Sequence, residues 1–121
     1  MTESLRGAVL VFVGGGLGAL LRYLAALLVG GPLATLTVNL AGAFAIGLVA
    51  AAVPLLAGNV RLFFMTGLLG GFTTMSAFSL DALELWQRGQ GTSALAYVAA
   101  TMLGCLAAVA LGAWAGMMMA R

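Results

Sequence analysis

Long apolar runs, separated by short turns, make up most of the chain. They cover residues 7–29, 33–57, 61–86 and 92–119, and each is long enough for a membrane-spanning helix, which needs roughly 20 mostly apolar residues. Helix-breaking residues mark the turns at residues 30–32, 58–59 and 88–91. The pattern predicts an all-α membrane protein with four transmembrane helices in a single domain and both termini on one side.

The third run differs because glycines and hydroxyls crowd its centre, in the stretch GGFTTMSAFS at residues 70–79. If the Gly70-Gly71 pair unwinds the helix, the freed backbone groups must face protein, an ion or water, because lipid cannot satisfy them. We therefore predict a break in helix three at this pair, and we regard the break as a candidate ion site.

Several side chains near this break could meet an anion. Ser76 and Ser79 share one helical face and offer hydroxyl donors, and Phe78 on an adjacent face carries the positive edge of an aromatic ring. Asn39 in helix two offers two amide N–H donors. Each residue alone also has a structural explanation, since hydroxyls bond back to the preceding turn, an amide joins two helices, and a phenyl ring packs. The cluster favours an anion site more than any single member does.

Arg22 interrupts the first run shortly before the turn. A charge near the bilayer centre costs about 2.5 to 3.5 kcal/mol on insertion scales, and less toward an interface. Arg22 therefore either extends to the headgroups or stands at the mouth of an ion path, where its positive charge favours anions.

Glycine spacing indicates how the helices pack. Gly14 and Gly18, Gly67 and Gly71, and the series from Gly104 to Gly116 recur at intervals of four residues, which lets helices approach closely in lipid. We expect tight packing along these ridges, with a second copy of the chain as the partner of one of them.

Composition excludes several functions. The chain has 121 residues, of which 64% are hydrophobic and 7% charged, so it has no room for a soluble domain. Histidine is absent, the acids number three, and Cys105 is the single cysteine, which predicts neither an enzyme nor a side-chain metal cluster. We expect Cys105 to be a small buried residue, and the first run to be a retained helix rather than a cleaved signal. The few arginines give only a weak orientation bias, so the chain could insert either way up.

Three motifs are characteristic when taken together. GLLGGFTTMSAFS, with GALLRY in the first helix and TVNLAGAFAIG in the second, resembles the CrcB/Fluc family of fluoride channels over nearly the whole chain. The resemblance implies a dual-topology antiparallel dimer with two fluoride pores and a structural sodium ion at the dimer interface. Matched residue by residue, it implies main-chain sodium ligands at Gly70 and Thr73, a fluoride path with Asn39, Phe78 and, in place of its first phenylalanine, Met75, and the helix-one arginine at Arg22. The chemistry of the side chains adds the hydroxyls of Thr74 and Ser76 to this path and a pore mouth at Arg22.

The chain departs from the family pattern within this path. The usual TTFSTFS is TTMSAFS here, so Met75 stands for a phenylalanine and Ala77 for a threonine. A thioether has no ring edge, and alanine removes a hydroxyl donor. The departures raise the alternative that the chain is one subunit of a heterodimeric fluoride channel.

The function that follows from the resemblance is passive, fluoride-selective export from the cytoplasm, which would reduce fluoride toxicity, across the cell inner membrane or plasma membrane. A small multidrug-proton antiporter is a further alternative with the same helix count. Such a transporter needs a membrane-embedded carboxylate, whereas Asp81 and Glu84 lie near the end of helix three.

Overall fold

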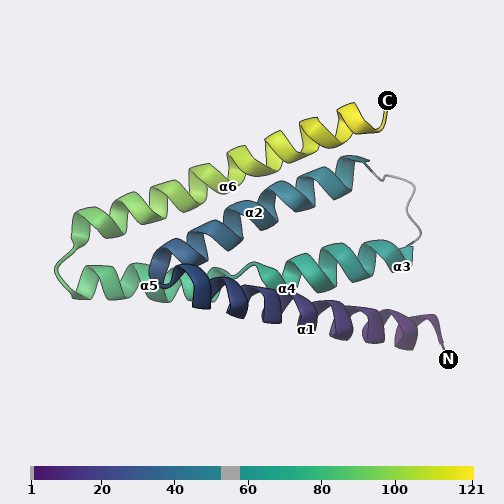
Figure 1. The fold of residues 1–121 in the computed structure, drawn as a ribbon, viewed down its shortest axis with the longest axis horizontal. Coiled ribbons are helices and arrows are strands. Elements are labelled where there is room, and N and C mark those ends of the chain that lie inside the picture. Colours follow the sequence, from purple (N-terminus) through teal and green to yellow (C-terminus); the bar gives the residue numbers. More distant parts are fainter. Residues whose placement is uncertain (1, 53–57) are drawn as a thin grey trace.

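The protein folds as a bundle of long helices (Figure 1). The computed structural model describes residues 2–52 and 58–121, and no strand occurs in these two ranges. The helices are α1 (Glu3–Val29), α2 (Gly31–Ala52), α3 (Gly58–Arg61), the π-helix η1 (Leu62–Leu69), α4 (Gly70–Phe72), α5 (Met75–Gln87) and α6 (Gly91–Met119). α3, η1, α4 and α5 follow one another as a third span, so the described residues contain four spans long and apolar enough to cross a bilayer. The chain is therefore a multi-pass membrane protein.

The first three spans begin before the apolar runs that predicted them, and capping or turn residues explain two of these earlier starts. α1 begins at Glu3 rather than at residue 7, because the Thr2 hydroxyl accepts the Leu5 amide at 3.3 Å. α2 begins at Gly31 rather than at residue 33, because Gly30 and Gly31 make the turn at positive φ and Pro32 suits a first helical turn. The third span begins at Gly58 rather than at residue 61. The predicted end of helix two at residue 57 lies outside the described residues.

The interruption of the third span lies at Thr73 and Thr74, where the backbone is extended. The predicted position at Gly70-Gly71 is wrong, because Gly70 and Gly71 are helical. A Cβ atom at Gly71 would overlap the backbone of Gly15 in α1, so this glycine allows close helix packing and does not unwind the helix.

Two seams hold the bundle together. α1 packs along η1 and α4, and α2 packs along α6. A Cβ atom at Gly14 or Gly18 would overlap η1 backbone, and one at Gly112 or Gly116 would overlap α2 backbone. The glycine ridges thus pack tightly as expected, but they do so within one chain. The expectation that a second copy covers one of these ridges is not met, because the described helices already occupy them.

The third span changes partner at its interruption. η1 and α4 pack on α1, whereas α5 packs on α6 (Figure 1). The N-terminus, the C-terminus and α3 lie at the same end of the bundle, as the helix count predicts. The change of partner coincides with the extended residues Thr73 and Thr74, which lie near the middle of the third span and next to Asn39 of α2.

Candidate ion-conduction site

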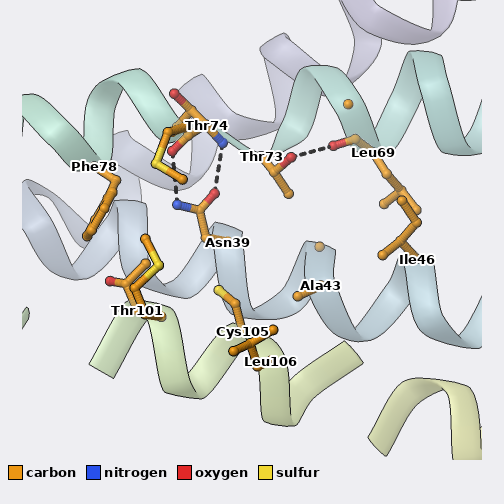
Figure 2. Close-up of a pocket in the computed structure, with 14 residues that line it drawn as sticks. Asn39, Ala43, Ile46, Leu69, Thr73, Thr74, Phe78, Thr101, Cys105 and Leu106 are labelled. Carbon is orange, nitrogen blue, oxygen red and sulfur yellow. Dashed lines mark hydrogen bonds between the residues drawn. The ribbon is translucent and has the colours of Figure 1, made fainter. Parts of the chain in front are cut away.

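A pocket of about 370 Å³ lies beside the interruption (Figure 2). Its walls come from α2, from the third span on both sides of Thr73-Thr74, and from α6. The predicted site residues among its lining are Asn39, Gly70, Thr73, Thr74, Met75 and Phe78. The pocket is mostly apolar, and none of the described residues that line it carries a charge. Ions could therefore be held here only by dipoles, main-chain groups and side-chain hydrogen-bond donors.

Asn39 bridges α2 to the interruption with two hydrogen bonds (Figure 2). Its Nδ2 donates to the Thr74 carbonyl at 3.0 Å, and its Oδ1 accepts the Thr74 amide at 2.8 Å. Asn39 is only 8% exposed, and Gly42, one turn later, leaves room for the Thr73 methyl group. Asn39 therefore does link α2 to the third span, as its structural explanation required. The second hydrogen on Nδ2 is still free to serve as a donor toward the pocket.

The same bonds release two backbone carbonyls from the helical pattern. In an unbroken helix the Thr74 amide would donate to the Gly70 carbonyl and the Ala77 amide to the Thr73 carbonyl. Here Thr74 N–H donates to Asn39 Oδ1, and Ala77 N–H donates to the Thr74 hydroxyl at 3.1 Å. The carbonyls of Gly70 and Thr73 have thereby lost their helical donors, and both residues line the pocket.

Thr74 also starts the second half of the span. It is the N-cap of α5, with an extended backbone and a hydroxyl that accepts the Ala77 amide. The hydroxyls of Thr74 and Ser76 are 3.1 Å apart and share a hydrogen bond. Ser76 does not belong to the pocket lining, and its exposed side chain lies at the cap. The N-cap threonine, more than the glycine pair, is the local cause of the break.

α6 supplies a wall of the pocket that the sequence did not indicate. Thr101 and Cys105 line it one turn apart, and the Cys105 sulfur points toward Asn39 (Figure 2). Thr101 is 4% exposed, and its hydroxyl has no hydrogen-bond partner within the described part of the chain. Cys105 is partly exposed rather than simply buried, which corrects our expectation for it. The spacing of Tyr97, Thr101 and Cys105 at four-residue intervals was the signal that could have identified this face.

Phe78 closes the pocket on the side of α5. It is 6% exposed, and its ring lies 5.4 Å from that of Tyr97, centroid to centroid. The Tyr97 hydroxyl donates to Asp81 Oδ2 at 3.0 Å. Met75, the other residue predicted on this face, also lines the pocket but is 64% exposed. The two α5 residues thus form an inner and an outer part of the same wall.

Arg22 lies apart from this pocket. Its Nε donates to the Gly71 carbonyl at 3.2 Å, so at least this nitrogen is engaged inside the protein and not at the headgroups. It lines a second, smaller pocket of about 110 Å³ together with Thr35, Thr74 and Ala77. Thr74 contributes to both pockets, whereas Asn39 lines only the larger one and Arg22 only the smaller one.

Comparison with a family model and with individual relatives points to the same family. A family model described as "CrcB-like protein, Camphor Resistance (CrcB)" matches residues 9–113. A protein of Mesorhizobium japonicum named fluoride-specific ion channel FluC is 47% identical over 113 residues, which are 87% of this chain and 91% of the relative. Proteins with the same name from Paracoccus denitrificans (46% identical, 88% of this chain and 90% of the relative) and Rhodopseudomonas palustris (42%, 93% and 94%) are similarly close.

Proposed function

The chain belongs to the CrcB-like family, a family of ion channels and not of enzymes, and we propose that it forms a passive channel through which fluoride leaves the cytoplasm. One observation carries the proposal: a break in a membrane span opens onto an uncharged pocket that joins Asn39, Phe78 and a threonine hydroxyl with no partner in the described chain. The bacterial cell membrane, as the inner or plasma membrane, is the proposed location.

The pocket suits the chemistry of fluoride. The ion is small and strongly hydrated, so a selective path must replace its water with donors at close range. The free Nδ2 hydrogen of Asn39, the hydroxyls of Thr74 and Thr101, and the edge of the Phe78 ring are such donors, and no carboxylate among the described lining residues would repel the anion. Ser76 contributes through its hydrogen bond to Thr74.

Arg22 supports an entrance on the other side of Thr74. Its guanidinium places a positive charge in the smaller pocket, whose lining includes the hydroxyl residues Thr35 and Thr74. A fixed positive charge raises the local concentration of anions at a narrow entrance. The proposed path runs from Arg22 past Thr74 to the pocket that contains Asn39.

A sodium ion fits the main-chain carbonyls beside the path. Sodium is a hard cation that prefers oxygen ligands, and the carbonyls of Gly70 and Thr73 have lost their helical donors. When bound, the ion would supply positive charge near an otherwise uncharged pocket. Thermal unfolding of the purified chain in sodium against choline salts tests this part, with a higher midpoint expected in sodium.

We further propose that the chain assembles as an antiparallel dimer. Gly70 and Met75 line the pocket yet are exposed in the single chain, so the pocket opens on the surface and a second subunit would close it. Dual topology agrees with the weak charge bias, because Arg6, Arg61 and Arg121 lie on the side opposite Arg88.

The partner in this dimer is either a second copy or a related subunit. The thioether of Met75 forms the outer wall of the pocket where the family pattern has a ring, which favours the heterodimer as the second candidate. A multidrug-proton antiporter is less well supported, because the Asp81 carboxylate accepts a hydrogen bond from the Tyr97 hydroxyl and Asp81 lies outside the lining of both pockets.

Reconstitution tests the proposal directly. The purified chain is placed in liposomes loaded with potassium fluoride or potassium chloride, and efflux is followed with an ion-selective electrode after valinomycin is added. Fluoride efflux without chloride efflux supports a homodimeric channel, and fluoride efflux only after a related subunit is added supports the heterodimer. Proton-coupled uptake of organic cations, with no fluoride efflux in either case, would overturn the proposal.

A further inference from the structure

Three sulfur-containing residues line the pocket at the interruption. Met75 comes from the first turn of α5, and Met102 and Cys105 come from α6. Met102 and Cys105 are three residues apart, so they project from the same face of α6. Sulfur-containing side chains from two separate elements therefore border one cavity of about 370 Å³.

The sulfur-containing residues of this lining favour one class of metal ion. Thiolate and thioether ligands favour soft cations such as Cu(I), whereas hard cations require carboxylates or carbonyls, which in this lining are the main-chain carbonyls of Gly70 and Thr73. No described lining residue is a carboxylate or a histidine, and Thr101, a further lining residue, has a buried hydroxyl with no partner among the described residues. A low-charge, sulfur-lined cavity of this kind disfavours a divalent ion and suits a monovalent one.

The two methionines can adjust to a metal ion. Met75 and Met102 are both exposed in the single chain, and the unbranched thioether side chain has three rotatable bonds. Cys105 is more enclosed, and its sulfur already points into the cavity toward Asn39 (Figure 2). Cys105 can therefore serve as the fixed ligand while the methionines move onto the ion.

We propose that this pocket binds a soft monovalent cation, of the class of Ag(I) and Cu(I), through Cys105 together with Met75 and Met102. On binding, a sulfur-metal bond forms, the S–H bond of Cys105 breaks, and its proton passes to water; no electron is transferred. The site goes beyond fluoride conduction and does not depend on it.

Silver binding to the detergent-purified full chain tests the proposal. Silver nitrate is titrated by calorimetry in a chloride-free nitrate buffer, and bound silver is counted by mass spectrometry after desalting. We expect one silver ion per chain, with release of one proton, and loss of this binding in Cys105→Ser. The double variant Met75→Leu/Met102→Leu should bind about tenfold more weakly or worse.

A matched control separates a three-sulfur site from a lone reactive thiol. Met117→Leu/Met118→Leu removes two exposed thioethers from the end of α6, outside the pocket, and should bind silver as the wild-type chain does. Leucine conserves volume in both double variants, so folding should be preserved. Equal silver affinity of the two double variants, or full binding by Cys105→Ser, would overturn the site. Fluoride efflux that continues at saturating silver would instead contradict the path proposed through this pocket, so the two failures are distinguishable.

Discussion

The two halves of the third span, η1 with α4 before the interruption and α5 after it, pack in different ways within one apolar segment. Before Thr73, η1 and α4 lie on α1 with glycines at the contact and backbone against backbone. After Thr74, α5 lies on α6 through side chains and borders the pocket. The first half has little space between its helices, whereas the second encloses space and polar groups. The difference indicates that the first half fixes the bundle through its contact with α1, whereas the second half, together with Leu69 and Gly70 at the end of the first, borders the site.

A physical reason underlies this division. Lipid is as apolar as the helices, so no hydrophobic force drives them together, and close contact through small residues has to provide the attraction. Extended backbone at membrane depth is tolerated only where other groups satisfy it. The contact of α1 with η1 and α4 provides the close packing through small residues. Asn39 and the Thr74 hydroxyl provide the hydrogen bonds that satisfy the extended backbone. Substitutions in the two regions should therefore fail in different ways.

The largest effect is expected at Gly18 in the α1 seam. In Gly18→Ala the new Cβ would overlap the Leu68 carbonyl and lie 2.7 Å from the Phe72 amide nitrogen, so the two helices must move apart. Overpacking of this kind costs typically about 1 to 3 kcal/mol and occasionally more, and contacts with backbone place this change at the upper end. Detergent-purified yield, size-exclusion profile and thermal unfolding measure the loss.

Gly16→Ala is the matched control on the same helix. A Cβ at Gly16 has nothing within 4 Å among the described residues, so this variant should be at least as stable as the wild-type chain. If both variants unfolded alike, helix propensity and not the seam would explain the result, and the proposed contrast between the two halves would be wrong.

Asn39→Asp should impair conduction more than folding. The carboxylate keeps an acceptor for the Thr74 amide, but it loses the donor to the Thr74 carbonyl and places a negative charge beside the proposed path. The proposed bond from the Asn39 amide to the fluoride ion involves a charged partner and is worth about 1.5 to 3 kcal/mol, so its loss should lower fluoride efflux roughly tenfold to hundredfold. Liposome efflux at matched protein content is the measurement.

Thr37→Val controls for the loss of a polar group from α2. The exposed Thr37 hydroxyl bonds back to the Leu33 carbonyl at 2.7 Å and lines neither pocket. Efflux should stay near the wild-type rate. Wild-type efflux in Asn39→Asp would remove Asn39 from the path and leave it only its structural role.

Hydrophobic patterning predicted the four spans, and the comparisons confirm the family. The position of the break was missed because glycine has two explanations, and only the contact of Gly71 with Gly15 decides between them. The α6 wall was missed because Thr101 and Cys105 are single, unremarkable residues in an apolar run, and their significance depends on what they face. The path and sodium assignments stay predictions.

Thr74→Val should have a moderate effect on stability, because it removes the N-cap of α5 and adds no charge to either pocket. Loss of an N-cap threonine typically lowers protein stability by about 1 kcal/mol. In this variant the Ala77 amide loses its acceptor, the Thr74 hydroxyl, and the Thr73 carbonyl is the acceptor that a regular helix would offer it. We expect lower thermal stability and weaker sodium dependence of that stability. Thr74→Ser keeps the cap and should restore both, and equal behaviour of the two variants would contradict the capping role.

Arg22→Lys should give the smallest effect, and it separates the two functions of this side chain. The positive charge remains at the second pocket, but a lysine lacks the planar guanidinium whose Nε donates to the Gly71 carbonyl in α4. If Arg22 attracts anions mainly by charge, fluoride efflux falls only about two- to threefold and stays sensitive to ionic strength. Arg22→Gln, which removes the charge, should then lower efflux further at low salt. A lysine variant as impaired as the glutamine variant would mean that Arg22 acts through its hydrogen bond to Gly71 in the first half of the span, and not through its charge beside the path.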